Sequence, residues 1–383
     1  MFEAYIDAAA GLERNKSSIA EHSSIVKDSP KPTLIDIFCG AGIGAAGFLK
    51  AGFRIAAAVD IDEDACKVYE KNIGVKPIVG DLRGITGREI LKSAGLKRGE
   101  ATACSGCPPC QAFSSLRETT RVKGLRDRRK SLLRTYANRI EEILPRVVLL
   151  ENVAGLAGRK NRRFLFSFVR RMEGLGYSCD YRVLNAADYG VAQRRRRLVL
   201  IGVREGKPAL PEPTHSKDGK GGKPYHVKVA EVIRGLPPLR SGQASRKDPL
   251  HFAPKHSEGV IKLIRKIPKD GGSRSALPRS AWLDCHLKLG EQGAGSVYGR
   301  LSWQKVAGTI TTRATTPSCG RFVHPSQNRG LSLREVAKLQ SVPDDFGFEG
   351  TRSQIAEWIG NGMPTLLAEA VGRRTAQLAA TFA

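Results

Sequence analysis

Long apolar runs, a secretory leader and an acidic balance are all missing from this 383-residue sequence. No stretch approaches the roughly eighteen apolar residues of a membrane span, and the N-terminus lacks a basic segment followed by an apolar one. Acidic residues are scarce, with 37 Asp and Glu against 63 Lys and Arg and a net charge of +26. We therefore expect a soluble cytoplasmic protein without membrane contacts. Its excess positive charge favours a polyanionic partner, above all nucleic acid.

Short apolar strands alternate with helical segments in the first half of the chain. Strand-like runs occupy residues 33–38, 54–60, 76–81 and 146–150, and helical patterns occupy 45–52, 63–72 and 131–144. This order predicts an α/β fold with a parallel, doubly wound sheet. The chain divides into a polar extension (1–32), a large α/β domain (33–205), a smaller irregular domain (206–325) and a C-terminal segment that returns to the large domain (326–383). The smaller domain is rich in Gly, Pro, Ser and Lys, and its basic residues outnumber its acidic ones.

A glycine-rich turn, Phe38-Cys-Gly-Ala-Gly42, follows the first strand. Glycines at such a place let the backbone approach a ligand closely, and the next helix offers free N–H groups to an anion. The spacing is not the full G-x-G-x-x-G pattern, and the turn alone is equally consistent with a structural role. Asp60 ends the second strand, where it can accept from ribose hydroxyls, and Asp81 ends the third, where it can accept from the amino group of adenine. Together these features favour an adenosine-containing ligand.

Three cysteines lie at intervals of three in Cys104-Ser-Gly-Cys-Pro-Pro-Cys110, and eight in the whole chain are too few for a disulfide framework. An iron–sulfur cluster of the ferredoxin pattern needs a fourth cysteine followed by proline, but Ser114 and Ser115 stand there. A zinc site needs a further Cys or His pair, and no histidine lies between His22 and His215. Long-range ligands leave a metal site open. The alternative is that Cys110, stiffened by two prolines, is a nucleophile, with Cys104 and Cys107 as small space-filling residues.

The motifs, in their order, resemble those of single-chain bacterial DNA (cytosine-5)-methyltransferases over about residues 33–372. They comprise Asp36-Ile-Phe-Cys-Gly-Ala-Gly42, Pro108-Pro-Cys-Gln111, Glu151-Asn-Val153, Gln193-Arg-Arg-Arg-Arg197, the segment Arg300–Thr312 and Gly360-Asn-Gly-Met363. The resemblance implies a Rossmann-like class I methyltransferase domain with a target-recognition domain. Two positions depart from the pattern: Cys107 stands where the family usually has Gly, and Gly362 where Ser or Ala is more common.

The resemblance also implies a role for each site residue. Cys110 would attack carbon 6 of cytosine, Glu151 would bind and protonate ring nitrogen 3, Arg195 would bind the carbonyl oxygen, and Arg197 would support these groups. S-adenosylmethionine would be the methyl donor and S-adenosylhomocysteine the product, with no metal. The residues expected to hold this cofactor are Phe38, Gly40, Ala41, Gly42, Ile43, Asp60, Ile61, Asp81, Leu82 and Asn361.

The expected partner is double-stranded DNA, because a stacked base must be flipped out of the duplex before it can react. Residues 116–131 would form a basic loop that closes over the flipped base, and residues 206–300 would read the target sequence. We expect a nucleoid-associated monomer, with a cognate restriction endonuclease as a candidate partner in the same system. Two rival interpretations are a tRNA cytosine-5 methyltransferase on the same scaffold and a non-catalytic DNA-binding relict. The basic module at 206–300 favours DNA, and intact Cys110, Glu151 and Arg195 favour an enzyme.

Overall fold

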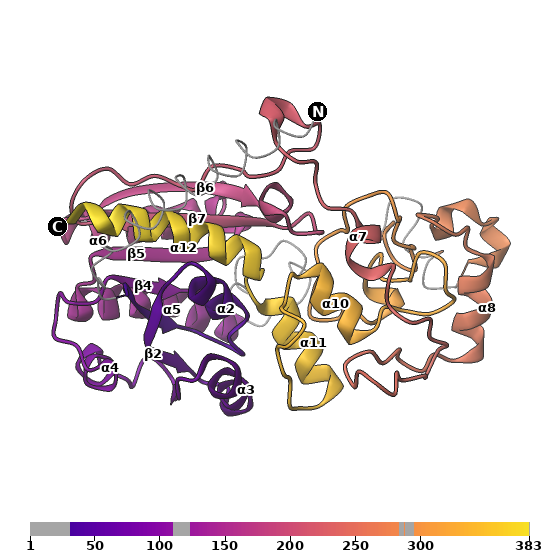
Figure 1. The fold of residues 1–383 in the computed structure, drawn as a ribbon, viewed down its shortest axis with the longest axis horizontal. Coiled ribbons are helices and arrows are strands. Elements are labelled where there is room, and N and C mark those ends of the chain that lie inside the picture. Colours follow the sequence, from indigo (N-terminus) through magenta and orange to yellow (C-terminus); the bar gives the residue numbers. More distant parts are fainter. Residues whose placement is uncertain (1–30, 110–122, 283–286, 288–294, 383) are drawn as a thin grey trace, which may run out of the picture. The chain divides into compact units, whose positions relative to one another are not determined.

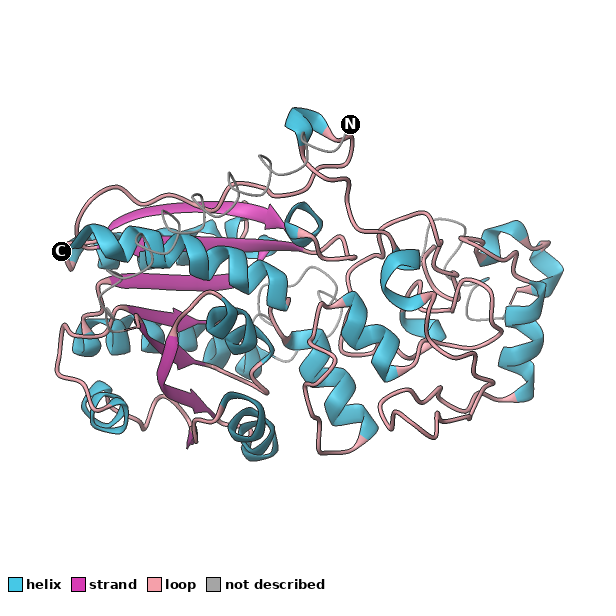
Figure 2. Ribbon diagram, in the orientation of Figure 1, coloured by secondary structure: helices cyan, strands magenta, loops and turns pink. Residues whose placement is uncertain are grey.

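The computed structural model describes residues 31–109, 123–282, 287 and 295–382, and the fold below is that of Pro32–Ala383 (Figure 1). Its centre is a seven-stranded sheet with the strand order β3-β2-β1-β4-β5-β7-β6 (Figure 2). The strands are β1 (Thr33–Ile37), β2 (Arg54–Asp60), β3 (Ile78–Val79), β4 (Ala103–Gly106), β5 (Val147–Val153), β6 (Ser178–Asn185) and β7 (Arg196–Val203). The α/β class predicted from the sequence is confirmed.

One part of the sheet differs from the parallel arrangement expected. The first five strands in chain order pair in parallel, whereas β7 is antiparallel to both β5 and β6. The reason is the short connection between β6 and β7, which consists of residues 186–195 and includes the 3₁₀ turn η4 (Ala186–Tyr189). A parallel pair needs a crossover of about a dozen residues or more, usually through a helix.

Helices cover both faces of the sheet. Apolar side chains of α4 (Gly87–Ala94), α5 (Lys123–Ile143) and α6 (Arg162–Gly174) form one core with the strands. On the other face, α2 (Ile43–Lys50) and the C-terminal α12 (Thr365–Ala379) share a second core, to which Tyr69 of α3 (Glu63–Ile73) belongs. The C-terminal segment thus packs directly on the first helix after the glycine turn.

The contact between α2 and α12 depends on a glycine. A Cβ atom at Gly47 would lie 2.3 Å from the carbonyl oxygen of Thr365 and 2.7 Å from Cβ of Ala368. The hydroxyl of Thr365 also donates to the carbonyl of Ile43 at 3.0 Å. These close contacts fix the start of α12 beside the start of α2, and so they place the Gly360–Met363 segment at the glycine turn.

Between β7 and the C-terminal helices the chain is largely irregular. The α-helices between β7 and α12 are α7 (Val229–Ile233), α8 (Glu258–Lys266), α10 (Leu333–Leu339) and α11 (Arg352–Asn361). The short 3₁₀ turns elsewhere in the fold are η3 (Ala154–Ala157), η5 (Lys220–Gly222), η6 (Arg274–Ala276), η7 (Arg279–Ala281), η8 (Pro317–Cys319) and η9 (Ala380–Phe382). The buried guanidinium of Arg300 ties loops together by donating to the carbonyls of Ile264, Ile267, His324 and Gln327. Buried hydrogen bonds from this guanidinium hold the irregular stretch together.

The helices begin with the capping signals that short helices need. Asp62 caps α3 by accepting from the backbone N–H groups of Asp64 and Ala65, and Ser332 with Glu335 forms a capping box at α10. Within the described ranges, no helix is both long and apolar enough to cross a membrane. The predicted domain boundaries at residues 206 and 326 stay predictions, since side chains from both sides of residue 326 share one hydrophobic core.

Candidate active site

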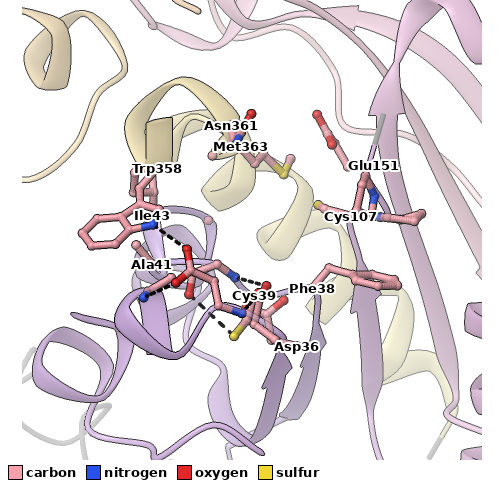
Figure 3. A pocket seen from close by; sticks show the side chains of 18 of the residues that line it. Asp36, Phe38, Cys39, Ala41, Ile43, Cys107, Glu151, Trp358, Asn361 and Met363 are labelled. Atoms are coloured by element: carbon pink, nitrogen blue, oxygen red, sulfur yellow. Dashed lines mark hydrogen bonds between the residues drawn. The ribbon is translucent and has the colours of Figure 1, made fainter. Parts of the chain in front are cut away.

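A cavity of about 440 Å³ opens at the carboxyl ends of β1, β2, β4 and β5 (Figure 3). In an open α/β sheet this edge, where the strand order reverses between β1 and β4, is the usual place for a ligand. Nine of the ten residues expected to hold a cofactor line the cavity: Phe38, Gly40, Ala41, Ile43, Asp60, Ile61, Asp81, Leu82 and Asn361. The tenth, Gly42, faces α3 instead, where an added Cβ atom would lie 3.0 Å from side-chain atoms of both Tyr69 and Ile73.

The glycine turn has a backbone that few residues adopt. Gly40 and Gly42 have φ angles of 52° and 91°, and Phe38 has a φ of 61° although it carries a side chain. A left-handed conformation is unfavourable for a bulky residue, and such strain often occurs at functional sites. The Phe38 ring packs edge-on against Tyr136 of α5 with centroids 6.5 Å apart, which holds it in place.

Asp60 supports the turn directly. Its Oδ2 accepts from the backbone N–H of Gly40 at 2.8 Å, and its Oδ1 accepts from the N–H of Asp62 at 2.9 Å. Burial raises the pKa of Asp60, and these backbone hydrogen bonds partly oppose that rise. Each oxygen retains a lone pair, so the carboxylate can both brace the turn and accept from a ligand hydroxyl.

The predicted adenine end of the cavity carries an apolar and an acidic side chain. Ile61 is 67% exposed, which is unusual for an isoleucine and offers a surface for an aromatic ring. Asp81 is paired with Arg83, whose Nε lies 2.9 Å and 3.0 Å from the two carboxylate oxygens. The expected contact of Asp81 with an amino group stays a prediction.

Two further residues of the cavity, Trp358 and Asp36, were not among the predicted site residues. Trp358 of α11 lines the cavity, and its Nε1 donates to Oδ2 of Asp62 at 2.9 Å, so the C-terminal segment is fastened to the start of α3 (Figure 3). Asp36 of β1 is 7% exposed and accepts from the hydroxyl of Tyr69 at 3.2 Å. Burial raises the pKa of Asp36 to about 7, against the lowering effect of the Tyr69 hydrogen bond. The run of apolar residues around Asp36 could have flagged it as a buried carboxyl group.

The other end of the cavity holds Glu151 and Arg197. Nε of Arg197 lies 2.8 Å from Oε1 of Glu151, and both side chains are 13% exposed. The next residue, Asn152, is buried and donates from Nδ2 to the carbonyl of Pro108 at 3.0 Å. The Glu-Asn-Val motif therefore holds the Pro-Pro segment as well as the acid itself.

Arg195 lies beside this pair but is engaged elsewhere. It is 1% exposed; Nη1 donates to the carbonyl of Ile310 at 2.7 Å, and Nη2 donates to the carbonyls of Gly360 and Gly362 at 2.9 Å and 3.1 Å. Arg195 thereby joins three motifs that are distant in the sequence. It also lines the cavity, and its predicted contact with a base carbonyl stays a prediction.

The cysteines have different environments. Cys110 and residues 116–122 of the predicted loop lie outside the described residues, whereas residues 123–131 belong to the first turns of the helix α5 and not to a loop. Cys104 is completely buried in the core of the sheet, as a space-filling residue would be. Cys107 instead lines the cavity. Among the described side chains, no three His, Cys, Asp or Glu residues group together as metal ligands would.

The departure at Gly362 has a packing explanation. A Cβ atom at this position would lie 3.1 Å from both Cβ and Cδ1 of Ile43 and 3.3 Å from its Cγ2. These distances are shorter than most side-chain contacts, so Ser or Ala would press on Ile43. The glycine at position 362 therefore leaves room for Ile43, the first residue of α2.

Comparisons with known proteins show the family of the chain. The family described as C-5 cytosine-specific DNA methylase matches residues 33–377. The chain is 32% identical to the Type II methylase M.HgiDII of Herpetosiphon aurantiacus over 89% of this chain and 94% of the relative. It is 33% identical to the Type II methyltransferase M.XorII of Xanthomonas oryzae pv. oryzae over 89% of this chain and 84% of that relative.

Solved structures show the same fold. A DNA modification methyltransferase encoded within an E. coli prophage superposes with a TM-score of 0.68 at 22% identity, over 91% of this chain and 99% of that one. The Entamoeba histolytica methyltransferase EhMeth gives a TM-score of 0.61 at 14% identity, over 91% and 99% of the two chains. With its family motifs gathered at one edge of the sheet, the chain belongs to the C-5 cytosine-specific DNA methylases, which transfer a methyl group from S-adenosylmethionine to cytosine in DNA.

Proposed function

We propose that methyl transfer proceeds through a covalent bond between the Cys110 sulfur and carbon 6 of a flipped-out cytosine. The observation that carries this proposal is the position of Pro108, which is held by Asn152 next to the Glu151–Arg197 pair. The two residues that follow Pro108 along the chain are Pro109 and Cys110. We infer that Pro108 and Pro109, whose backbones are stiff, direct the Cys110 sulfur to the end of the cavity where the acid lies.

The chemistry needs both a nucleophile and an acid. Addition of the Cys110 thiolate to carbon 6 moves an electron pair into the ring, and a proton from Glu151 to ring nitrogen 3 neutralises the charge that develops. Carbon 5 then forms its bond to the methyl group, which the cofactor would supply as an electrophilic carbon, and S-adenosylhomocysteine leaves with the electron pair of the broken sulfur–methyl bond. Transfer of the proton from carbon 5 to a base, such as water, expels the Cys110 sulfur as thiolate, and the proton on ring nitrogen 3 returns to Glu151, which restores the ring.

The residues at the other end of the cavity fit S-adenosylmethionine. Asp60 can accept from ribose hydroxyls, Ile61 offers an apolar surface to adenine, and the Phe38–Ile43 turn lets the backbone approach the methionine part. Asn361, at the end of α11, lines the same cavity. We propose that these groups, with Asp81 and Leu82, hold the cofactor, and that no metal takes part.

DNA recognition belongs to the same proposal. We infer that residues 206–300 read base edges of double-stranded DNA, and that a restriction endonuclease of matching specificity accompanies the enzyme, since the relatives carry Type II names. We also propose that the protein is a cytoplasmic monomer, associated with the nucleoid through its binding to DNA. Replacing residues 206–300 by the corresponding segment of a relative with another specificity should redirect methylation to the relative's site; a chimera still active at the original site would refute this assignment.

Bisulfite sequencing of DNA from cells that express the protein tests the central proposal. Wild-type protein should protect cytosine within one short sequence, and Cys110→Ser should protect none while still binding S-adenosylhomocysteine. Cys319→Ser is the matched control, because Cys319 is exposed, and it should behave as wild type. Methylation by Cys110→Ser at the wild-type rate would refute the covalent step, and methylation of tRNA without DNA would favour the RNA-directed interpretation.

A further inference from the structure

A hydrogen bond between Trp358 and Asp62 joins two walls of the cavity. One wall consists of the end of β2 and the start of α3, where Asp60 and Ile61 are proposed to hold adenosine. The other wall is α11, which carries Asn361. Nε1 of Trp358 donates to Oδ2 of Asp62 at 2.9 Å, across 296 positions of the chain. The mechanism proposed above gives this contact no role.

The direction of the Trp358 indole is fixed by its surroundings. The side chain is 6% exposed, and the backbone of Gly350 lies directly against its six-membered ring. A Cβ atom added to Gly350 would lie 2.7 Å from Cη2 and 3.0 Å from Cζ3 of Trp358. Figure 3 shows the side chain at the end of the cavity that holds Ala41 and away from Glu151. A ring with so little room to turn keeps its N–H aimed in one direction.

The carboxylate of Asp62 accepts hydrogen bonds at both oxygens. Oδ1 accepts from the backbone N–H groups of Asp64 and Ala65 at 3.1 Å each, which caps α3, and Oδ2 accepts from Trp358. The backbone N–H of Asp62 itself donates to Oδ1 of Asp60 at 2.9 Å. Asp62 is therefore bonded to its own helix, to the end of β2 and to α11. Bonds to an ionised carboxylate are stronger than those between neutral groups.

Ile61 depends on these bonds, because its own side chain does little to hold it. It lies between Asp60 and Asp62 in the chain and is 67% exposed, so burial does not fix this segment. Both neighbours are held by hydrogen bonds instead. Asp60 accepts from the backbone of Gly40, and Asp62 accepts from Trp358. The surface that Ile61 offers to adenine is therefore placed by its neighbours.

We propose that Trp358 is a positioning residue for the cofactor, whose indole N–H holds residues 60–62 at a fixed distance from the wall that carries Asn361. Trp358 and Asn361 are three positions apart on α11 and lie on the same side of this helix. The bond to Asp62 thus sets the width of the cavity between residues 60–62 and Asn361. The inference deepens the cofactor role proposed for these residues, on which it rests, because it makes affinity depend on one bond between the two walls.

Two substitutions in the full-length protein remove this bond from either side. Trp358→Phe keeps an aromatic ring without the N–H. In Asp62→Asn the side-chain oxygen can still cap α3, but the amide nitrogen that replaces Oδ2 cannot accept from Trp358. We expect each variant to raise the Kd for S-adenosylhomocysteine by about threefold to tenfold, as the loss of one hydrogen bond does. The double variant should bind no more weakly than either single one, because both remove the same bond.

The chemical step should be unaffected. At saturating S-adenosylmethionine and DNA, the single-turnover rate of Trp358→Phe should stay within about twofold of wild type, while its KM for S-adenosylmethionine rises. Trp282→Phe is the matched control. Nε1 of Trp282 donates to the carbonyl of Leu277 at 3.1 Å, outside the cavity lining, so this variant should keep the wild-type Kd. Calorimetric titration gives each Kd, and thermal unfolding gives each Tm.

Three results would overturn the inference. One is an unchanged Kd in Trp358→Phe. Another is a double variant whose loss of affinity equals the product of the two single losses, since the residues would then act separately. The third is a lower Tm together with a slower rate at saturating cofactor, which would assign the change to the fold. Failure of the proposed cofactor role looks different: wild type would not bind S-adenosylhomocysteine, or Asp60→Ala would bind it as tightly as wild type.

Discussion

Arg197 and Glu151 form an ion pair of 2.8 Å at the end of the cavity, although they lie on different strands and are 46 positions apart in the chain. The pairing follows from the register of β5 and β7, in which Val153 lies opposite Arg197 and Glu151 opposite Val199. Arg197 therefore reaches Glu151 diagonally across the strand pair. Arg195, which the family resemblance assigned to the base, uses its guanidinium to join Ile310, Gly360 and Gly362.

Substitution of Arg197 tests whether this pair serves catalysis. Arg197→Ala should lower the single-turnover methylation rate by about 100-fold or more, the usual effect of removing one oriented charged donor from an active site. Arg196→Ala is the matched control, because Arg196 is exposed and neighbouring residues of a strand point to opposite faces. Comparable loss in both variants would assign the effect to the basic segment in general, and the Glu151–Arg197 pair would lose its catalytic role.

Asp60 should govern affinity for the cofactor. Asp60→Ala should weaken binding of S-adenosylhomocysteine by about 1.5–3 kcal/mol, the range for hydrogen bonds to a charged group. Calorimetric titration measures this, with Glu63→Ala as control, since the Glu63 side chain is 70% exposed and lies outside the cavity. Because its pKa is raised, Asp60 takes up a proton at a higher pH than an ordinary carboxylate does when the solution is acidified. Affinity for S-adenosylhomocysteine should fall as Asp60 is protonated, and Asp60→Ala should lack this pH dependence. An unchanged Kd would leave Asp60 as a brace for the Gly40 backbone only.

The buried carboxyl group of Asp36 should make stability depend on pH. Its pKa in the folded protein is about 7, against 3.8 for an ordinary aspartate, so the folded state binds a proton that the unfolded chain releases. The free energy of unfolding should therefore decrease as the pH rises from about 4 to about 7. Asp36→Asn should remove this slope and stabilise the protein at pH 8 by about 2 to 4 kcal/mol. Urea unfolding at several pH values measures it, and the same slope in Asp36→Asn would contradict the assignment.

The exposed Asp345 offers a control for the Asp36 experiment. Asp345→Asn should leave both the slope and the stability at pH 8 close to wild type. If Asp36→Asn gains stability but binds S-adenosylmethionine more weakly, the buried charge is retained for the ligand at a cost to the fold, a common compromise at active sites.

Local patterns were sufficient to predict most of the residues that line the end of the cavity next to the glycine turn. The strand, the glycine turn and the next helix are consecutive in the sequence. Asp60, which ends β2, and Asp81, two residues after β3, must meet them at one edge of the sheet because these strands are parallel. The strand β4 was missed because Ala103–Gly106 has no β-branched residue and owes its place to burial between β1 and β5. Tertiary packing there overrides intrinsic propensity.

Contacts between segments that are distant in the chain could not be predicted from the sequence. Whether Arg195 or Arg197 meets Glu151 depends on the register of an antiparallel pair that a parallel sheet does not anticipate. The hydrogen bond from Trp358 to Asp62 joins positions 296 residues apart, and no sequence spacing predicts such a contact.

The closest backbone approach at the C-terminal motif provides the last prediction. A Cβ atom at Gly360 would lie 2.3 Å from the backbone nitrogen of Thr312 and 2.4 Å from the carbonyl carbon of Thr311, so the two chain segments must separate to admit a methyl group. Separation would also pull the Gly360 carbonyl from Arg195. Gly360→Ala should therefore lower the free energy of unfolding by about 2 kcal/mol or more and weaken cofactor binding, because Trp358 and Asn361 lie on the same helix.

Gly259→Ala is the matched control for this substitution. Gly259 is exposed within α8, and an added Cβ atom would meet nothing within 4 Å. The alanine should be neutral or stabilise the protein by up to about 1 kcal/mol, because alanine favours helix more than glycine does. Chemical denaturation of both variants gives the comparison. Equal stability of Gly360→Ala and Gly259→Ala would show that residues 311–312 can move away from position 360 at no cost. The hydrogen bonds from Arg195 would then not be needed to hold the C-terminal motif at the cavity.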